Sequence, residues 1–274
     1  MTSVKWNLFN LFFWSMLLDF TMTVLVCPLV IMPVIAQVPI GVLTDMGVPP
    51  VLQLFFNLAV FITLCVSLIA IMENRYFLLF AKNTAWKSVR KPFILINYIL
   101  IVSFLIPIAM HIPDQQWAVE TMHPEIPSFL FSKPLCIVSI DYFYISISVL
   151  LAGSAIILES YAFGVLLYKN IRKHSRKQSL KTFHMQKKFL LAIAVQSLIP
   201  LILMTGPAAY FVYSISTDYY NQMLNNVSLI VISSHGWVST IIMVLIHEPY
   251  RNFCFGKLRM TRMDLRGKTV ETRF

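Results

Sequence analysis

Four side chains that could carry chemistry stand inside long apolar stretches of the sequence. They are Asp19, Asp141, Glu159 and His235. An acidic group in hydrocarbon costs about 2.5 to 3.5 kcal/mol on insertion scales, so such a group is expected to be paired, hydrogen-bonded or functional. The chemistry open to these residues is therefore proton exchange, hydrogen bonding between helices and polar contact with a ligand.

Asp19 and Glu159 lie at similar depths from the same side of their apolar stretches, so both could face a polar centre of a helical bundle. Two hypotheses follow for this pair, a structural polar network and a role in switching between states. Motifs of the common catalytic classes are missing: the chain has no zincin or zinc-ribbon spacing, no Gly-x-Ser-x-Gly elbow and no phosphate-binding glycine loop. We therefore expect no enzyme activity, no metal and no cofactor.

A second group of residues forms the ligand-pocket candidates. Asp141 lies near the outer end of its stretch beside Tyr142 and Tyr144, where a ligand entering from outside could reach it, although its carboxylate could equally extend to the outer headgroups. His235 lies near the middle of the last stretch. It could contact a ligand or make a hydrogen bond between helices.

The elements that must position these residues are six apolar runs, each long enough to span a bilayer, which needs roughly 20 residues for roughly 30 Å of hydrocarbon. Hydrophobic residues make up 58% of the 274-residue chain and the mean hydropathy is +0.73, which favours an all-α polytopic membrane bundle over a soluble domain. The predicted spans are residues 11–36, 48–72, 93–112, 134–168, 189–216 and 223–247.

Positive charge alternates with these spans. All of the 22 lysines and arginines except Lys133 lie before the first span, in the second and fourth connections, or in a basic tail over residues 248–274. Basic residues beside a span stay on the cytoplasmic side, so both termini and these two connections are predicted to be cytoplasmic. The net charge of +10 does not indicate nucleic-acid binding, because the basic residues are loop and tail residues and form no soluble face.

The cytoplasmic border holds further candidates. Glu73 and Arg75, followed by Tyr76, could form a lock that opens on activation or a plain boundary pair. The basic run of the fourth connection could bind anionic lipid, at about 1 kcal/mol per residue, or a cytosolic protein. Cys254 in the tail is a candidate for reversible lipidation. The run and the tail contribute the remaining contact candidates: Arg172, Lys173, Arg176, Lys177, Pro249, Tyr250 and Arg251.

Several ordered segments carry a resemblance to a known family. They are VKWNLFNLFFWSMLLDF, ENRYFLLF, HIPDQ, HMQKKFLLAIAVQSLIP, YYNQMLNN, SSHGWVSTIIM and HEPYRNF. With these segments the chain resembles the nematode chemoreceptors called serpentine receptor class H, members of a seven-transmembrane superfamily. The resemblance covers nearly the whole chain. It begins at what corresponds to the first cytosolic loop, so the six spans are expected to be helices two to seven, and the first helix is absent from the chain as written.

This resemblance implies a multi-pass receptor in the plasma membrane of chemosensory neurons, at their cilia, that detects a small molecule and signals through a heterotrimeric G protein. In the family pattern, Glu73 to Tyr76 close the third helix, and Pro249, Tyr250 and Arg251 close the seventh. Two alternatives remain: a membrane solute carrier or channel, which would be expected to show an internal repeat or a polar line through the bundle, and a truncated product that does not signal.

Overall fold

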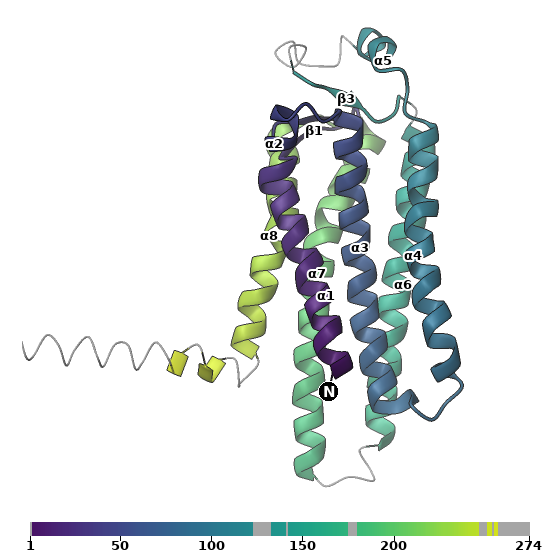
Figure 1. Cartoon of the computed structure of the whole chain (residues 1–274), viewed down its shortest axis with the longest axis vertical. Helices are drawn as coiled ribbons and strands as arrows, with labels where there is room; N and C mark the ends of the chain where they lie inside the picture. Colours follow the sequence, from purple (N-terminus) through teal and green to yellow (C-terminus); the bar gives the residue numbers. More distant parts are fainter. Residues whose placement is uncertain are drawn as a thin grey trace, which may run out of the picture.

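The computed structural model describes residues 2–122, 133–140, 142–174, 180–246, 251–253 and 255–256. Long helices run side by side along one axis (Figure 1). This arrangement confirms the predicted helical bundle. In chain order the long helices are α1 (Thr2–Phe20), α3 (Pro50–Tyr76), α4 (Trp86–Met110), α6 (Tyr142–His174), α7 (Leu180–Thr217) and α8 (Gln222–Ile246).

Within the described residues, four helical stretches are long and apolar enough to cross a membrane by length and composition. An additional apolar helical stretch, Leu201–Thr217, is shorter and belongs to α7. The four long stretches are Trp6–Leu25, Pro50–Ala81, Trp86–Met110 and Ile145–Lys173. Two of them include a π-helical extension, η1 (Thr21–Leu25) after α1 and η2 (Phe77–Ala81) after α3.

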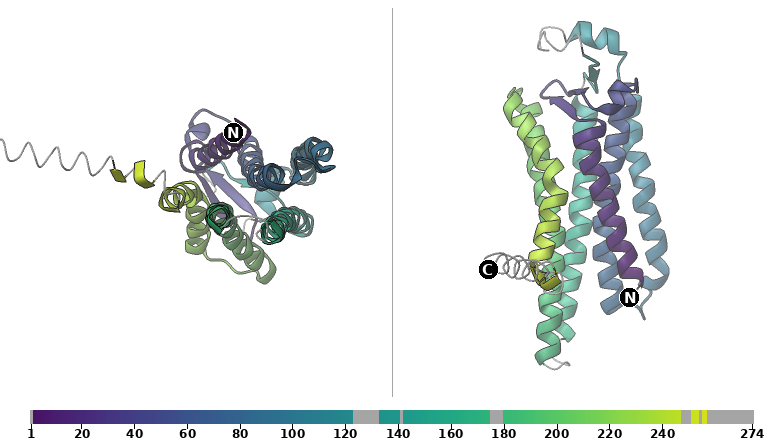
Figure 2. Two further views of the ribbon diagram at one scale, coloured as in Figure 1. Left: turned by 90° about the horizontal axis from the view of Figure 1, so that it is seen from below. Right: turned by 60° about the vertical axis from the view of Figure 1, so that its left-hand side comes forward.

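Helix α3 occupies the centre of the bundle. It packs against α1, α4 and α6, while α8 packs against α1 and α7. Figure 2 shows the same arrangement along the bundle axis. Hydrocarbon tails are as apolar as leucine, so helices in a membrane associate through close packing and interhelical hydrogen bonds. Leu64 and Leu68 of α3 accordingly pack with Leu11 of α1 in one cluster, and Asn10 Nδ2 donates to Ser67 Oγ at 2.9 Å.

The first span differs from the prediction of a helix over residues 11–36. Helical structure ends at Leu25, Cys27 adopts a φ of 42°, and the chain then forms an antiparallel hairpin of β1 (Pro28–Ile31) and β2 (Ala36–Pro39). Pro28 belongs to the first strand, and Pro33 lies in the turn between the two strands. Proline lacks the N–H that a helix interior needs, and the β-branched residues between them favour extended structure.

The fourth span also begins later than predicted. Residues 134–140 are not part of the helix, because β3 (Cys136–Ile137) pairs with β2, and α6 is described from Tyr142. The strand order is β1-β2-β3. Burial raises the pKa of the Cys136 thiol to about 11, so at neutral pH this cysteine is a protonated, apolar side chain.

A short helix covers the outer face of this sheet. Asp114 caps α5 (Gln115–Thr121) by accepting the Trp117 N–H at 3.0 Å. The Gln115 amide then bonds both the N–H and the carbonyl of Ile137, at 2.9 and 3.1 Å, as a neighbouring strand would. The sheet and α5 therefore form a cap at one end of the bundle (Figure 1).

Candidate functional site

A cavity of about 760 Å³ lies inside the bundle. Residues of β1, β2, α3, α4, α6, α7 and α8 line it, from Gln37 in the sheet to Met72 near the far end of α3. Leu54, Leu58, Phe61 and Cys65 in the lining recur at helical spacing, so one face of α3 forms a wall. A concave, mainly apolar site with a few polar groups is the usual form of a small-molecule site.

The cavity is not sealed on the side of α6 and α7. Tyr161, Tyr168 and Leu198 line it, yet each is more than half exposed. Helices α6 and α7 make few contacts with each other, whereas α7 packs closely along α8. An apolar molecule dissolved in the bilayer could therefore reach the cavity between these two helices.

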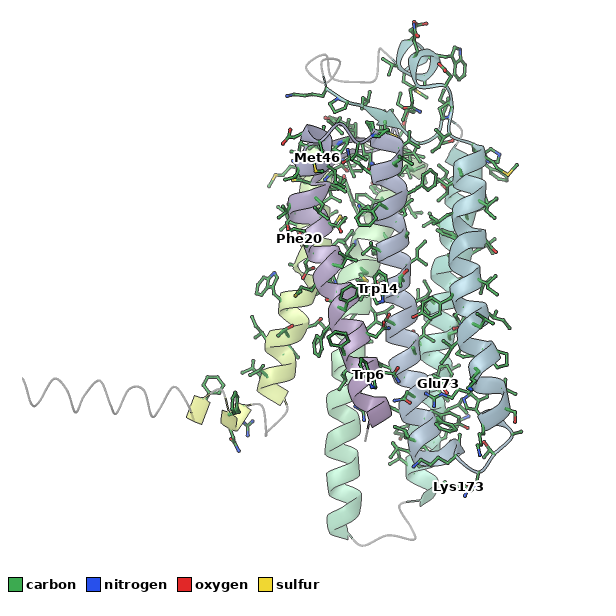
Figure 3. All side chains as sticks on the ribbon, viewed as in Figure 1. Trp6, Trp14, Phe20, Met46, Glu73 and Lys173 are labelled. Carbon is green, nitrogen blue, oxygen red and sulfur yellow. The ribbon has the colours of Figure 1, made fainter. Side chains whose placement is uncertain are left out.

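Glu73 is the centre of a polar cluster at the opposite end of the bundle from the sheet (Figure 3). Its side chain is fully buried. The carboxylate accepts from Trp86 Nε1 at 2.9 Å and from Arg90 Nε at 3.0 Å, and Arg90 Nη2 also donates to Asn74 Oδ1 at 2.6 Å. This ion pair of Glu73 with Arg90 joins α3 to α4.

Aromatic rings enclose this ion pair. The ring centres of Tyr76 and Trp86 lie 6.3 Å apart, and both rings pack on Phe163 of α6. The guanidinium of Arg90 also stacks 4.4 Å from the Phe77 ring centre. Such rings limit water access and stabilise the cation through their π-faces. The cluster therefore joins α3, α4 and α6 at the end of the bundle that lies away from the sheet.

Asp19 and His235 meet where α1 crosses α8. His235 Nδ1 lies 2.6 Å from the Ile232 carbonyl and 3.3 Å from Asp19 Oδ1, and its Nε2 lies 3.2 Å from Ser15 Oγ. These distances assign the proton to Nδ1 and make Ser15 the donor to Nε2. His235 is buried and is not among the cavity-lining residues. Its geometry agrees with a hydrogen bond between helices and not with contact to a ligand in the cavity.

The structure does not bring Asp19 and Glu159 to one polar centre. Asp19 lies at the contact of α1 with α8, whereas Glu159 lies on α6, near the side-chain amide of Asn97 on α4. The two acidic residues therefore lie at two separate contacts between helices. Within the described part of the chain, no group of three or more His, Cys, Asp or Glu side chains could hold a metal ion.

The remaining candidates fall into two groups. Arg172 and Lys173 are exposed at the end of α6, at the same end of the bundle as Glu73 (Figure 3), and Arg251 is exposed beyond α8. The other candidates cannot be placed: Asp141, Arg176, Lys177, Pro249, Tyr250 and Cys254 lie outside the described residues, and the side chains of Tyr142 and Tyr144 do as well.

Comparison with known families identifies this architecture. A model described as serpentine type 7TM GPCR chemoreceptor Srh matches residues 1–260. The chain belongs to this family. Among curated proteins, none matches the sequence. The receptor is therefore a multi-pass membrane protein of a chemoreceptor family.

Several important residues of the receptor were not singled out from the sequence. Trp86 and Arg90 were counted only within a connection, yet their spacing of four places them on one face of a helix, where both reach Glu73. Gln37 and Asn57 carry the two side-chain amides of the cavity lining, and each stands alone in an apolar segment. The alternation Ala36-Gln37-Val38 was the available signal for a strand with one polar face.

Proposed function

We propose that this chain is a chemosensory receptor that binds a small molecule in the central cavity and signals to a heterotrimeric G protein. The observation that carries the proposal is the apolar cavity of about 760 Å³ inside a chain that belongs to a chemoreceptor family. Its volume falls in the range of about 300 to 1,000 Å³ typical of small-molecule sites. The ligand would occupy the space between the sheet and the middle of the bundle.

The signalling part of the proposal concerns the end of the bundle that holds Glu73. Helices α3 and α4 are joined there by the Glu73–Arg90 ion pair, and the exposed Arg172 and Lys173 lie at the same end. We assign this end to the cytoplasm of a chemosensory neuron, where the G protein would bind. Basic side chains here would also contact anionic lipid.

A topology experiment tests this assignment. An epitope inserted after Asn83, between α3 and α4, is expected to react with antibody only after the cells are permeabilised. One inserted after Met46, at the sheet end, is expected to react on intact cells. The reason is that basic residues flanking spans are retained in the cytoplasm. Staining of intact cells through the Asn83 epitope would reverse the orientation.

Ligand detection can be tested with a pair of adjacent substitutions. Ala208 of α7 lines the cavity, whereas its neighbour Ala209 is exposed. Cells expressing the receptor would be screened for calcium responses to straight-chain alcohols, ketones and acids. We expect Ala208→Trp to weaken the response to the active compound at least tenfold, because the indole fills ligand space, and Ala209→Trp to leave it unchanged at equal surface abundance.

The same cells distinguish a receptor from a carrier or channel. Removing the coupled G-protein α subunit is expected to abolish the calcium response. Uptake or current that persists without the subunit would instead support a transport function. Equal responses from Ala208→Trp and Ala209→Trp would contradict binding in the cavity while leaving signalling intact.

A further inference from the structure

Two buried polar atoms in the cavity wall lack hydrogen-bond partners. Gln37 is only 4% exposed, and its Nε2 makes no hydrogen bond; Asn57 is half-buried, but its Oδ1 atom is covered and also makes none. Both residues line the cavity. A buried polar group left without a partner typically costs about 1–3 kcal/mol, so native proteins rarely retain one without a reason.

The fold holds Gln37 rigidly in this position. It lies on β2, the middle strand of the sheet, and pairs with Val30 of β1 and Cys136 of β3. Its neighbours Ala36 and Val38 pack in the cluster that includes Ala118 of α5. Because side chains alternate across a strand, Gln37 stands on the opposite face, toward the bundle.

Asn57 belongs to the cavity wall on α3. Its Nδ2 donates to Met22 Sδ at 3.2 Å, which orients the amide and leaves Oδ1 as the atom without a partner. Beside the serine, threonine and tyrosine hydroxyls of its lining, the cavity therefore has one unpaired amide donor on the sheet and one unpaired amide acceptor on the helix. A ligand that uses both must supply an acceptor and a donor of its own.

The rest of the lining defines the remainder of the ligand. Among the described residues that form it there is no Asp, Glu, Lys, Arg or His, and most are aliphatic, aromatic or methionine side chains. A charged molecule would therefore be desolvated without a counter-ion, which is strongly unfavourable. The cavity also borders the lipid-facing side of α6 and α7, which suits a molecule that partitions into the bilayer.

We infer that the ligand is a neutral, largely apolar molecule with a hydroxyl-type head group, which accepts a hydrogen bond from Gln37 Nε2 and donates one to Asn57 Oδ1. This inference rests on the proposed function, since it assigns the ligand of the same cavity. A hydroxyl supplies both roles within one uncharged group. Alkanes, ethers and carboxylates each lack at least one of these properties.

The test compares four probes with the same chain on the purified full-length receptor in lipid nanodiscs. 1-Decanol, decane, decyl methyl ether and decanoate are titrated, and each affinity is derived from the rise in the thermal unfolding midpoint. We expect 1-decanol to bind about tenfold more tightly than decane or the ether, as one or two hydrogen bonds to buried partners predict. Decanoate is expected to bind more weakly than 1-decanol.

Leucine substitutions then assign the head-group site. Gln37→Leu and Asn57→Leu are each expected to reduce the preference for 1-decanol over decane to about twofold or less. Gln116→Leu on the exposed face of α5 and Asn83→Leu in the exposed connection are matched controls that should keep it. The leucine variants without ligand should unfold at the same temperature as the wild type or higher, because each removes a buried group that has no partner.

Three results would overturn the inference. The first is equal binding of decane and 1-decanol to the wild type, as expected for a cavity that holds only lipid chains. The second is an unchanged preference in both leucine variants, and the third is a lower unfolding temperature for both without ligand. Binding is measured without a G protein, so alcohol binding without signalling would contradict the proposed function alone. A calcium response in cells that neither Gln37→Leu nor Asn57→Leu changes would contradict the head-group assignment alone.

Discussion

Replacing Arg90 with alanine is expected to lower the free energy of unfolding of the receptor by about 3–5 kcal/mol. The Glu73 side chain is fully buried and forms its ion pair with Arg90, so the substitution leaves a buried carboxylate with the Trp86 N–H as its remaining donor. Breaking one side of a buried pair has an effect of this size, because the other charge stays without compensation. Thermal or denaturant unfolding of the purified receptor would measure it.

Two further variants separate the ion pair from a general loss of positive charge. Lys91→Ala removes the neighbouring, exposed cation and is expected to change stability by less than about 0.5 kcal/mol. The double variant Glu73→Leu with Arg90→Met removes both charges and should recover most of the loss, since apolar replacement of a whole buried pair is often neutral. If Arg90→Ala and Lys91→Ala behave alike, the cluster does not stabilise the inner end of the bundle.

Replacing Gly236 with alanine is expected to destabilise the contact between α1 and α8 by about 1–3 kcal/mol, the usual effect of overpacking. A methyl group at this position would overlap the Asp19 carboxylate and press on Ser15 Oγ. The Asp19 and Ser15 side chains would have to move away, and their contacts with His235 would lengthen. The unfolding midpoint of the purified receptor and its abundance at the cell surface would report the change.

Gly206→Ala is the matched control for this prediction. Gly206 lies within α7, and a Cβ there meets no atom within 4 Å. Alanine is the better helix former by about 0.8–1.0 kcal/mol, so this variant should be neutral or stabilised. Adding Asp19→Ala to Gly236→Ala restores space for the methyl group and should recover part of the loss. A destabilisation of both glycine variants by the same amount would contradict the packing argument.

The helical part of the fold could be predicted because each span satisfies the bilayer locally. A run such as residues 48–72 is apolar over enough length to cross hydrocarbon, and α3 occupies it with a proline in its first turn. The sheet could not be predicted in the same way. Residues 28–39 are as apolar as their neighbours, and their strand structure depends on pairing with each other and with Cys136, which lies far along the chain.

The candidate site shows the same division. Acidic residues inside or beside apolar spans stood out by type alone, so Asp19, Glu73 and Glu159 were singled out. The residues that lie against each of them could not be predicted, because Arg90, His235 and Asn97 lie on other helices, and neighbouring spans can be packed in many rotations about their own axes. Gln37 and Asn57 are uncharged and therefore gave no signal of cost in the membrane.

The sequence by itself determined that this chain is a multi-pass helical membrane protein with its basic residues outside the spans, because hydrocarbon and water select residues one segment at a time. Only the tertiary structure decided which side chains meet. It paired Glu73 with Arg90 of another helix, placed Asp19 and Glu159 at different contacts between helices, and brought Gln37 to the wall of a cavity with Asn57. Those contacts depend on the rotation and register of neighbouring elements, which hydrophobic patterning along one segment does not specify.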